Sequence, residues 1–154
     1  MEGEKTHIHK NKVHKVLFHS YSAYFVFFLI GVCLDLIFNL KVFNGSSTTL
    51  GFISLIFGTI LVFWAQNTSR NLKKGQISKK TFSEGPYGFT RTPTNFGLFF
   101  LMLGFGMIAN AFFIIVCSFL AFFVAKFIFL EKEEKILTEK YGLPYLEYKK
   151  AIKF

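Results

Sequence analysis

The stretch FGLFFLMLGFGMIANAFFIIVCSFLAFFVAKFIFL, residues Phe96–Leu130, decides the fold class of this protein. It is 35 residues long and contains one charged side chain, Lys126. A helix needs only about 20 apolar residues to cross a bilayer, so the run is too long for one perpendicular span. It has a natural break between Ile108 and Ala111. We therefore predict a tight hairpin of two somewhat short spans, with a single long tilted helix as the alternative.

Two further apolar runs precede this block. The first covers Val16–Leu40 and is interrupted by Asp35, and the second covers Thr48–Ala65. Apolar residues make up 52% of the 154-residue chain and phenylalanine occurs 23 times, far above the average of soluble proteins. We therefore predict an all-α fold: a polytopic membrane helix bundle of about four transmembrane helices, including the C-terminal hairpin, plus short cytosolic C-terminal helices.

A cleaved signal peptide is the competing interpretation of Lys5–Leu40. Its uncharged run, Val16–Leu34, is longer than the apolar core of a signal peptide, and no small-residue cleavage site follows it. We therefore expect a retained span. The chain would then be one membrane domain, residues 1–154: a basic cytosolic tail (1–15), two spans (16–66), and a motif-rich region (67–154) with the hairpin (96–130) and a cytosolic tail.

The basic residues predict the orientation of the spans. They are concentrated before the first span, between the second and third, and after the fourth, and only Lys41 lies on the opposite side. By the positive-inside rule, both termini and the middle loop face the cytosol. The absence of an organelle signal favours a prokaryotic plasma membrane. The net charge of +9 also favours anionic lipid headgroups, and no recognition motif points to nucleic acid.

Metal and disulfide sites are not indicated. Cys33 and Cys117 lie inside apolar runs, away from any histidine or second cysteine. Irregular spacing on the basic tail favours solvated side chains over metal ligands for four histidines: His7, His9, His14 and His19.

A few other residues inside the spans have predicted structural roles. Asp35 is the only ionisable group well inside a span, which disfavours a channel or transporter, and we expect it to hydrogen-bond Asn39 or to reach the outer surface. Close packing of the two helices of the hairpin is the expected role of three glycines: Gly97, Gly104 and Gly106.

The segment GPYGFTRTPTNFG, Gly85–Gly97, leads into the hairpin. Its first four residues fit a type I turn, with proline second and glycine fourth. Thr92 followed by Pro93 is typical of an N-cap and the first position of a helix. The free amides of a helix start bind anions, and Arg91 stands beside them. The alternative is a well-capped membrane helix with an interfacial arginine.

The segment EKEEKILTEKYGLPYLEYKK, Glu131–Lys150, follows the hairpin. Glu134 shares a helical stripe with Leu137 and Tyr141, which favours one carboxylate turned inward. The alternative is a solvated face on which Glu131 pairs with Lys135.

A short second segment follows a helix end at Gly142 and Pro144. It places Tyr145 and Tyr148 on one side, where an interfacial aromatic belt is the alternative role. Because the hairpin is short, both segments emerge on the same face. An arginine, carboxylates and tyrosines together suit a zwitterionic, cationic ligand with an aromatic base.

These two segments together resemble the isoprenylcysteine carboxyl methyltransferase family and its phospholipid methyltransferase relatives. The resemblance covers roughly residues 83–151. The first half of the family pattern is matched by Gly85, Pro86, Tyr87, Arg91, Pro93 and Gly97. The second half is matched by Glu133, Glu134, Leu137, Tyr141, Gly142, Tyr145 and Tyr148.

The resemblance implies a membrane methyltransferase that uses S-adenosylmethionine and takes a lipophilic acceptor from the bilayer. It implies catalytic roles for Arg91, Glu134 and Tyr145. The cofactor-binding residues that it implies are Tyr87, Arg91, Thr92, Pro93, Asn95, Glu133 and Glu134.

Three positions depart from the family pattern. Thr92 stands where the family has histidine, and it can cap and hydrogen-bond but cannot stack or carry charge. Asn95 replaces the usual tyrosine, and Lys126 is the nearest basic residue to a position where the family tends to have arginine. Lysine offers a point charge in place of a bidentate fork.

The methyl acceptor stays open among a prenylated cysteine, a phospholipid amine, a small thiol and another isoprenoid. A carboxylate or thiolate needs no general base, whereas an amine must first lose a proton. Since no histidine lies near the motifs, the sequence favours an anionic acceptor. A non-catalytic scaffold derived from the same family is the alternative to an enzyme.

Overall fold

The computed structural model describes residues 21–42, 47–72 and 85–152, which are helical nearly throughout and contain no strand. The predicted all-α class is confirmed. The elements are a first helix, Tyr21–Phe38, then α2 (Thr48–Leu72), the 3-10 helix η1 (Gly85–Gly88), α4 (Pro93–Ile108), α5 (Phe112–Val124), the π turn η2 (Ala125–Phe129), α6 (Leu130–Tyr141) and α7 (Leu143–Ala151). The histidine-containing tail, the start of the first predicted span and most of the basic middle loop lie outside the described residues.

Within the described part of the chain, three helices are long and apolar enough to cross a membrane: Tyr21–Phe38, Thr48–Thr68 and Phe112–Glu139. The remaining predicted span, the third in chain order, corresponds to α4 and has 16 residues. At roughly 1.5 Å per residue it covers about 24 Å, less than the ~30 Å hydrocarbon core.

The predicted break in the long apolar block is confirmed. α4 ends at Ile108, and Asn110 adopts the left-handed conformation (φ 52°) before α5 begins at Phe112. The expectation that both spans of the hairpin are short is wrong, because α5 continues through η2 into α6 and only α4 is short.

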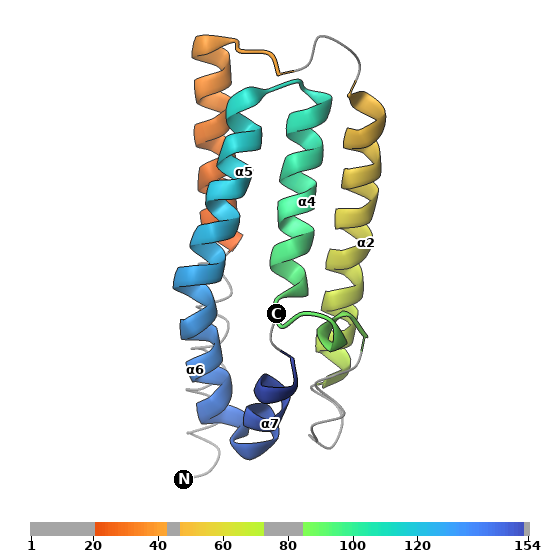
Figure 1. Ribbon diagram of the computed structural model, residues 1–154, viewed down its shortest axis with the longest axis vertical. Helices are drawn as coiled ribbons and strands as arrows, with labels where there is room; N and C mark the ends of the chain where they lie inside the picture. The colour runs from red at the N-terminus through yellow and green to blue at the C-terminus, as the bar shows by residue number, and fades with distance from the viewer. Residues whose placement is uncertain (1–20, 43–46, 73–84, 153–154) are drawn as a thin grey trace.

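The four apolar helices form an elongated bundle, with α4 between α2 and α5 and the first helix beside α5 (Figure 1). α6, α7 and η1 all lie at one end, which we call the site end. The turn between α4 and α5 lies at the other. The topology therefore brings the two motif segments to the same end of the bundle.

α2 and α4 approach closely because each carries glycine at two contact positions seven residues apart. An added Cβ at Gly51 would lie 2.9 Å from the carbonyl oxygen of Gly104, and one at Gly58 would lie 2.8 Å from the carbonyl oxygen of Gly97. The obstacles are backbone atoms, which cannot swing away. Packing within the hairpin is therefore wrong for Gly97 and Gly104, which face α2, and confirmed for Gly106, which lies against Ile115 of α5 (2.9 Å from an added Cβ).

Hydroxyl groups and aromatic rings complete the contact between α2 and α4. The Ser54 hydroxyl donates to the carbonyl oxygen of Phe100 (2.9 Å), and Phe57 meets Phe100 edge to face at 5.0 Å. Such contacts matter in a bilayer, where apolar burial between helices gives little driving force.

The predicted hydrogen bond between Asp35 and Asn39 is present in the backbone, from the Asn39 amide to the Asp35 carbonyl oxygen (2.8 Å). The side chain of Asp35 has a further role that was not predicted. Its carboxylate accepts hydrogen bonds from the backbone amides of Phe113 (3.0 Å) and Ile114 (2.9 Å), so it caps α5 from the first helix. Ala111, at the N-cap position of α5, makes no side-chain cap of its own. A carboxylate also complements the positive end of the helix dipole. The polar residue in the first span therefore joins two helices.

We expect Gly58→Leu to lower the free energy of unfolding by about 1–3 kcal/mol, because the added side chain meets the backbone of α4. Thermal unfolding in detergent measures the loss. The control is Thr59→Leu, one residue along and exposed on the lipid-facing side of α2. Equal melting temperatures for the two variants would contradict close packing at Gly58.

Candidate functional site

The segment before α4 bends sharply at the site end. η1 takes the place of the predicted type I turn, and Pro86 is fully buried and accepts from the amides of Phe89 and Thr90 (both 3.2 Å). Gly85 has a φ of +62°, which favours glycine. The bend directs the chain from the end of α2 across the site end to the start of α4.

Thr92 occupies the N-cap position of α4 with Pro93 following it, as predicted. The side chain of Thr92 makes no capping bond, however. Its amide donates to the Thr90 hydroxyl (3.3 Å), and its carbonyl accepts from the amide of Asn95 (3.1 Å). The helix start is therefore stabilised mainly by backbone groups.

A π turn, η2, decides which face of α6 points inward. The inward face of α5 includes Ala121 and extends to Ala125 at the start of η2, both fully buried. Continuing at roughly 3.6 residues per turn, an unbroken α-helix would bring Lys132 to that face. The wider turn shifts the pattern by one residue, so Lys132 is exposed while Glu133 is half-buried and Glu134 is buried. Lys126 lies within this turn and is half-buried.

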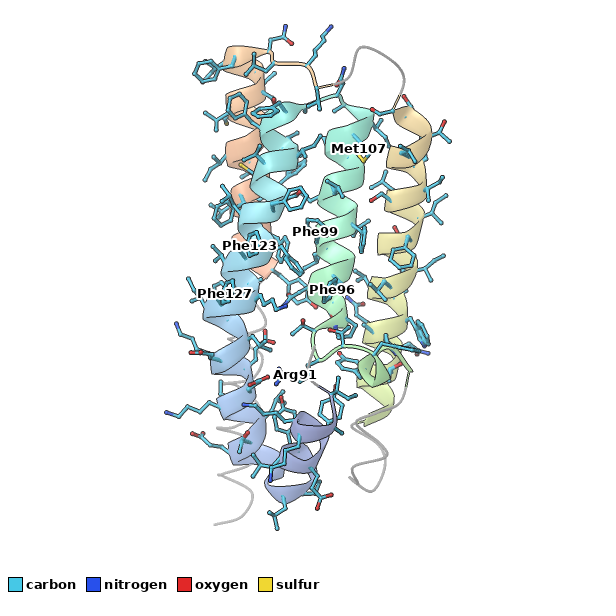
Figure 2. The ribbon with its side chains drawn as sticks, in the orientation of Figure 1. Arg91, Phe96, Phe99, Met107, Phe123 and Phe127 are labelled. Atoms are coloured by element: carbon cyan, nitrogen blue, oxygen red, sulfur yellow. The ribbon has the colours of Figure 1, made fainter. Side chains whose placement is uncertain are left out.

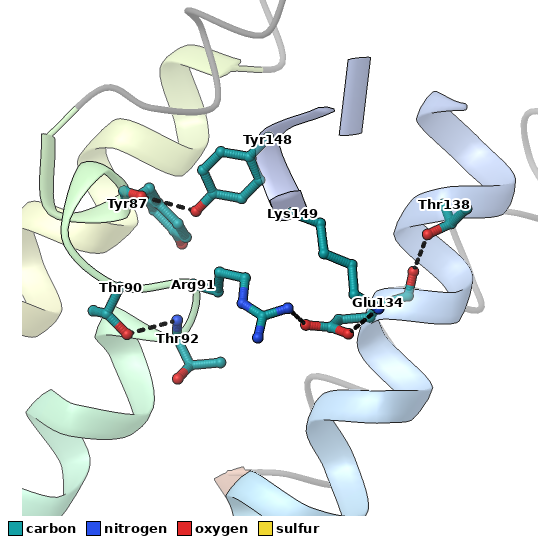
Figure 3. A network of polar contacts seen from close by, with 8 residues as sticks. All are labelled: Tyr87, Thr90, Arg91, Thr92, Glu134, Thr138, Tyr148 and Lys149. Carbon is teal, nitrogen blue, oxygen red and sulfur yellow. Dashed lines mark hydrogen bonds and ion pairs between the residues drawn. The ribbon is translucent and has the colours of Figure 1, made fainter. Parts of the chain in front are cut away.

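Glu134 is the electrostatic centre of the site end. Its side chain is 9% exposed, and its Oε1 forms an ion pair with Nη1 of Arg91 from the segment before α4 (Figure 3). Its Oε2 lies 2.6 Å from Nζ of Lys149 on α7. Figure 2 places Arg91 beyond the phenylalanines Phe96 and Phe99, at the end of the bundle. The predicted inward carboxylate is confirmed.

Two tyrosines attach α7 to the segment before α4. Tyr145 and Tyr148 are each 2% exposed, their rings are 5.9 Å apart, and the Tyr148 hydroxyl donates to the carbonyl oxygen of Tyr87 (2.8 Å). Burial raises the pKa of both phenols above the ordinary value. An interfacial aromatic belt is therefore the wrong description of this pair, since both rings are inside the protein.

Glu133 has a different environment from Glu134. It is half-buried, and the ion pairs with Arg91 and Lys149 are made by Glu134. The two adjacent glutamates therefore differ in their surroundings.

The predicted site residues fall into two groups. Arg91 and Glu134 are in direct contact, and Tyr87 is tied to α7 through Tyr148, with Tyr145 beside it. Pro93 and Asn95 lie in the first turn of α4, and the carbonyl of Asn95 accepts from the buried Tyr24 hydroxyl of the first helix (3.1 Å).

Sequence reasoning missed Lys149 as a partner of Glu134. Spacing along one helix cannot reveal it, because the two residues are on different helices. The only available signal was a run of basic residues at the end of α7.

The sequence profile of the phospholipid methyltransferase family matches residues 46–143. The chain belongs to this family. The matched region begins before α2 and ends at the start of α7, so it includes Arg91, Glu133 and Glu134 but not Tyr145 or Lys149. No curated protein and no solved structure matches the chain. Membership of the phospholipid methyltransferase family, together with the apolar helices, supports a membrane methyltransferase.

Proposed function

We propose that this protein transfers a methyl group from S-adenosylmethionine to a lipophilic acceptor. The observation that supports the proposal most directly is the part-buried Arg91–Glu134 ion pair beside two buried tyrosines, at the end of a bundle of apolar helices. A scaffold has little need for a nearly buried carboxylate, because a buried ion pair adds little to stability over apolar packing.

The donor set fits this cofactor. The carboxylate of Glu134 suits an ammonium group or ribose hydroxyls, and the guanidinium of Arg91 suits a carboxylate. Tyr87 is half-buried and offers an aromatic ring, which favours a sulfonium cation and a purine. When bound, S-adenosylmethionine supplies an activated methyl group. We propose Tyr87, Thr92, Pro93, Asn95 and Glu133 as further lining residues of the same site.

An amine acceptor must lose a proton before methylation. We propose Glu133, the half-buried carboxylate next to Glu134, as the group that would take this proton. A phospholipid amine and an isoprenylcysteine carboxylate are both candidate acceptors.

The membrane setting defines how the acceptor arrives. The apolar faces of the first helix and α2 are widely exposed, so we propose that a lipid reaches the site laterally from the bilayer. We further propose a single membrane domain with the site end and both termini in the cytosol, where basic residues contact anionic headgroups.

We expect detergent-purified protein to bind S-adenosylmethionine with micromolar affinity by calorimetry. Arg91→Ala and Glu134→Ala should each weaken binding at least about tenfold, because each removes a charge-assisted contact to the ligand. Glu131→Ala, an exposed carboxylate three residues before Glu134, should bind like the parent.

Size-exclusion chromatography establishes that each variant is folded and monodisperse. A folded parent that binds no S-adenosylmethionine would contradict the proposal and would favour the non-catalytic scaffold.

A further inference from the structure

Both oxygens of Glu134 are engaged by cations of the protein itself. Arg91 pairs with Oε1 from the segment before α4, and Lys149 reaches Oε2 from α7 at 2.6 Å. The two partners differ in burial, since the side chain of Arg91 is 15% exposed and that of Lys149 is 43% exposed (Figure 3). The arginine is built into the interior, whereas the lysine approaches from the solvent side.

A ligand with its own cationic group would compete with Lys149 for the carboxylate of Glu134. Two ammonium groups near one carboxylate oxygen repel each other, and a carboxylate that already has two partners has little attraction left for a third. An exposed ion pair of a long, flexible lysine is weak, so displacing it costs little. The ammonium group of a displaced lysine is strongly hydrated in water, which further lowers the cost of displacing it.

We propose that Lys149 is a resident counter-ion that occupies the ammonium position of the ligand site and leaves when the ligand binds. This inference rests on the proposed function, and it assigns Oε2 of Glu134 to the amino group of the methionine moiety. Arg91 stays on Oε1 and keeps the carboxylate oriented in both states.

Only the lysine side chain has to move. α7 is attached independently, because Tyr148 donates to the carbonyl of Tyr87 and Tyr145 is buried, and neither contact involves Lys149. The helix can therefore remain docked as a wall of the site while the ammonium group is exchanged. In the absence of ligand, Lys149 neutralises Glu134 and limits the charge left unpaired at the site end.

The test compares Lys149→Gln with Lys150→Gln by calorimetric binding of S-adenosylmethionine. Both substitutions remove one positive charge from the last turn of α7, but Lys150 is exposed and it is Lys149 that forms the ion pair with Glu134. We expect Lys149→Gln to bind about two- to fivefold more tightly than the parent, and Lys150→Gln to bind like it. Lys149→Arg, which keeps the charge, should show no gain in affinity.

Each other outcome overturns the inference. Weaker binding by Lys149→Gln would mean that the lysine holds Glu134 in a productive orientation, and equal gains in the two glutamine variants would mean a general effect of charge. If the folded parent and all variants fail to bind, the proposed function fails together with the inference, whereas normal binding without a gain in Lys149→Gln rejects the inference alone.

Discussion

A carboxylate that is nearly buried must be met by cations, and Glu134 meets this requirement with residues from two other parts of the chain. Arg91 arrives from the segment before α4 and Lys149 from α7. One side chain, that of Glu134, therefore connects the three segments that build the site end. Removing either the arginine or the glutamate leaves the other charge without its main partner at low exposure, so the two residues depend on each other.

The bundle positions this pair by packing that does not rely on apolar burial. Gly51 and Gly58 let α2 approach the backbone of α4, which holds α4 and the adjoining Arg91 segment against α2. On the other side, Asp35 caps α5 from the first helix. The π turn after α5 then shifts the inward face of α6 by one residue along the sequence, so that Glu134 points inward. The glycine contacts, the Asp35 cap and the π turn all position the backbone, and the backbone in turn positions the charged side chains.

Much of this fold could be predicted from local sequence patterns. The hairpin break near Asn110, the N-cap position of Thr92 and the inward face of Glu134 all depend on residues close together in the chain. The close packing at Gly97 and Gly104 also follows from residue type, although the helix that they contact does not.

The features that sequence patterns missed depend on distant partners or on backbone geometry. Asp35 caps a helix 78 residues away, which no periodicity encodes. The π turn has no composition that separates it from its α-helical neighbours, so the length of the continuous α5–α6 helix was not foreseen. The buried hydroxyl of Tyr148 donates to the carbonyl oxygen of Tyr87, 61 residues earlier, and this hydrogen bond exists only in the folded chain.

The measurement that tests the central claim most directly is methyl transfer in proteoliposomes. Purified protein is reconstituted in vesicles that contain phosphatidylethanolamine and a farnesylated cysteine, and S-adenosylmethionine labelled in its methyl group is added. The account predicts label in a lipid-soluble product with the parent, and its loss with the folded Arg91→Ala variant. No lipid-soluble label from a folded parent, or equal label from parent and variant, would contradict it.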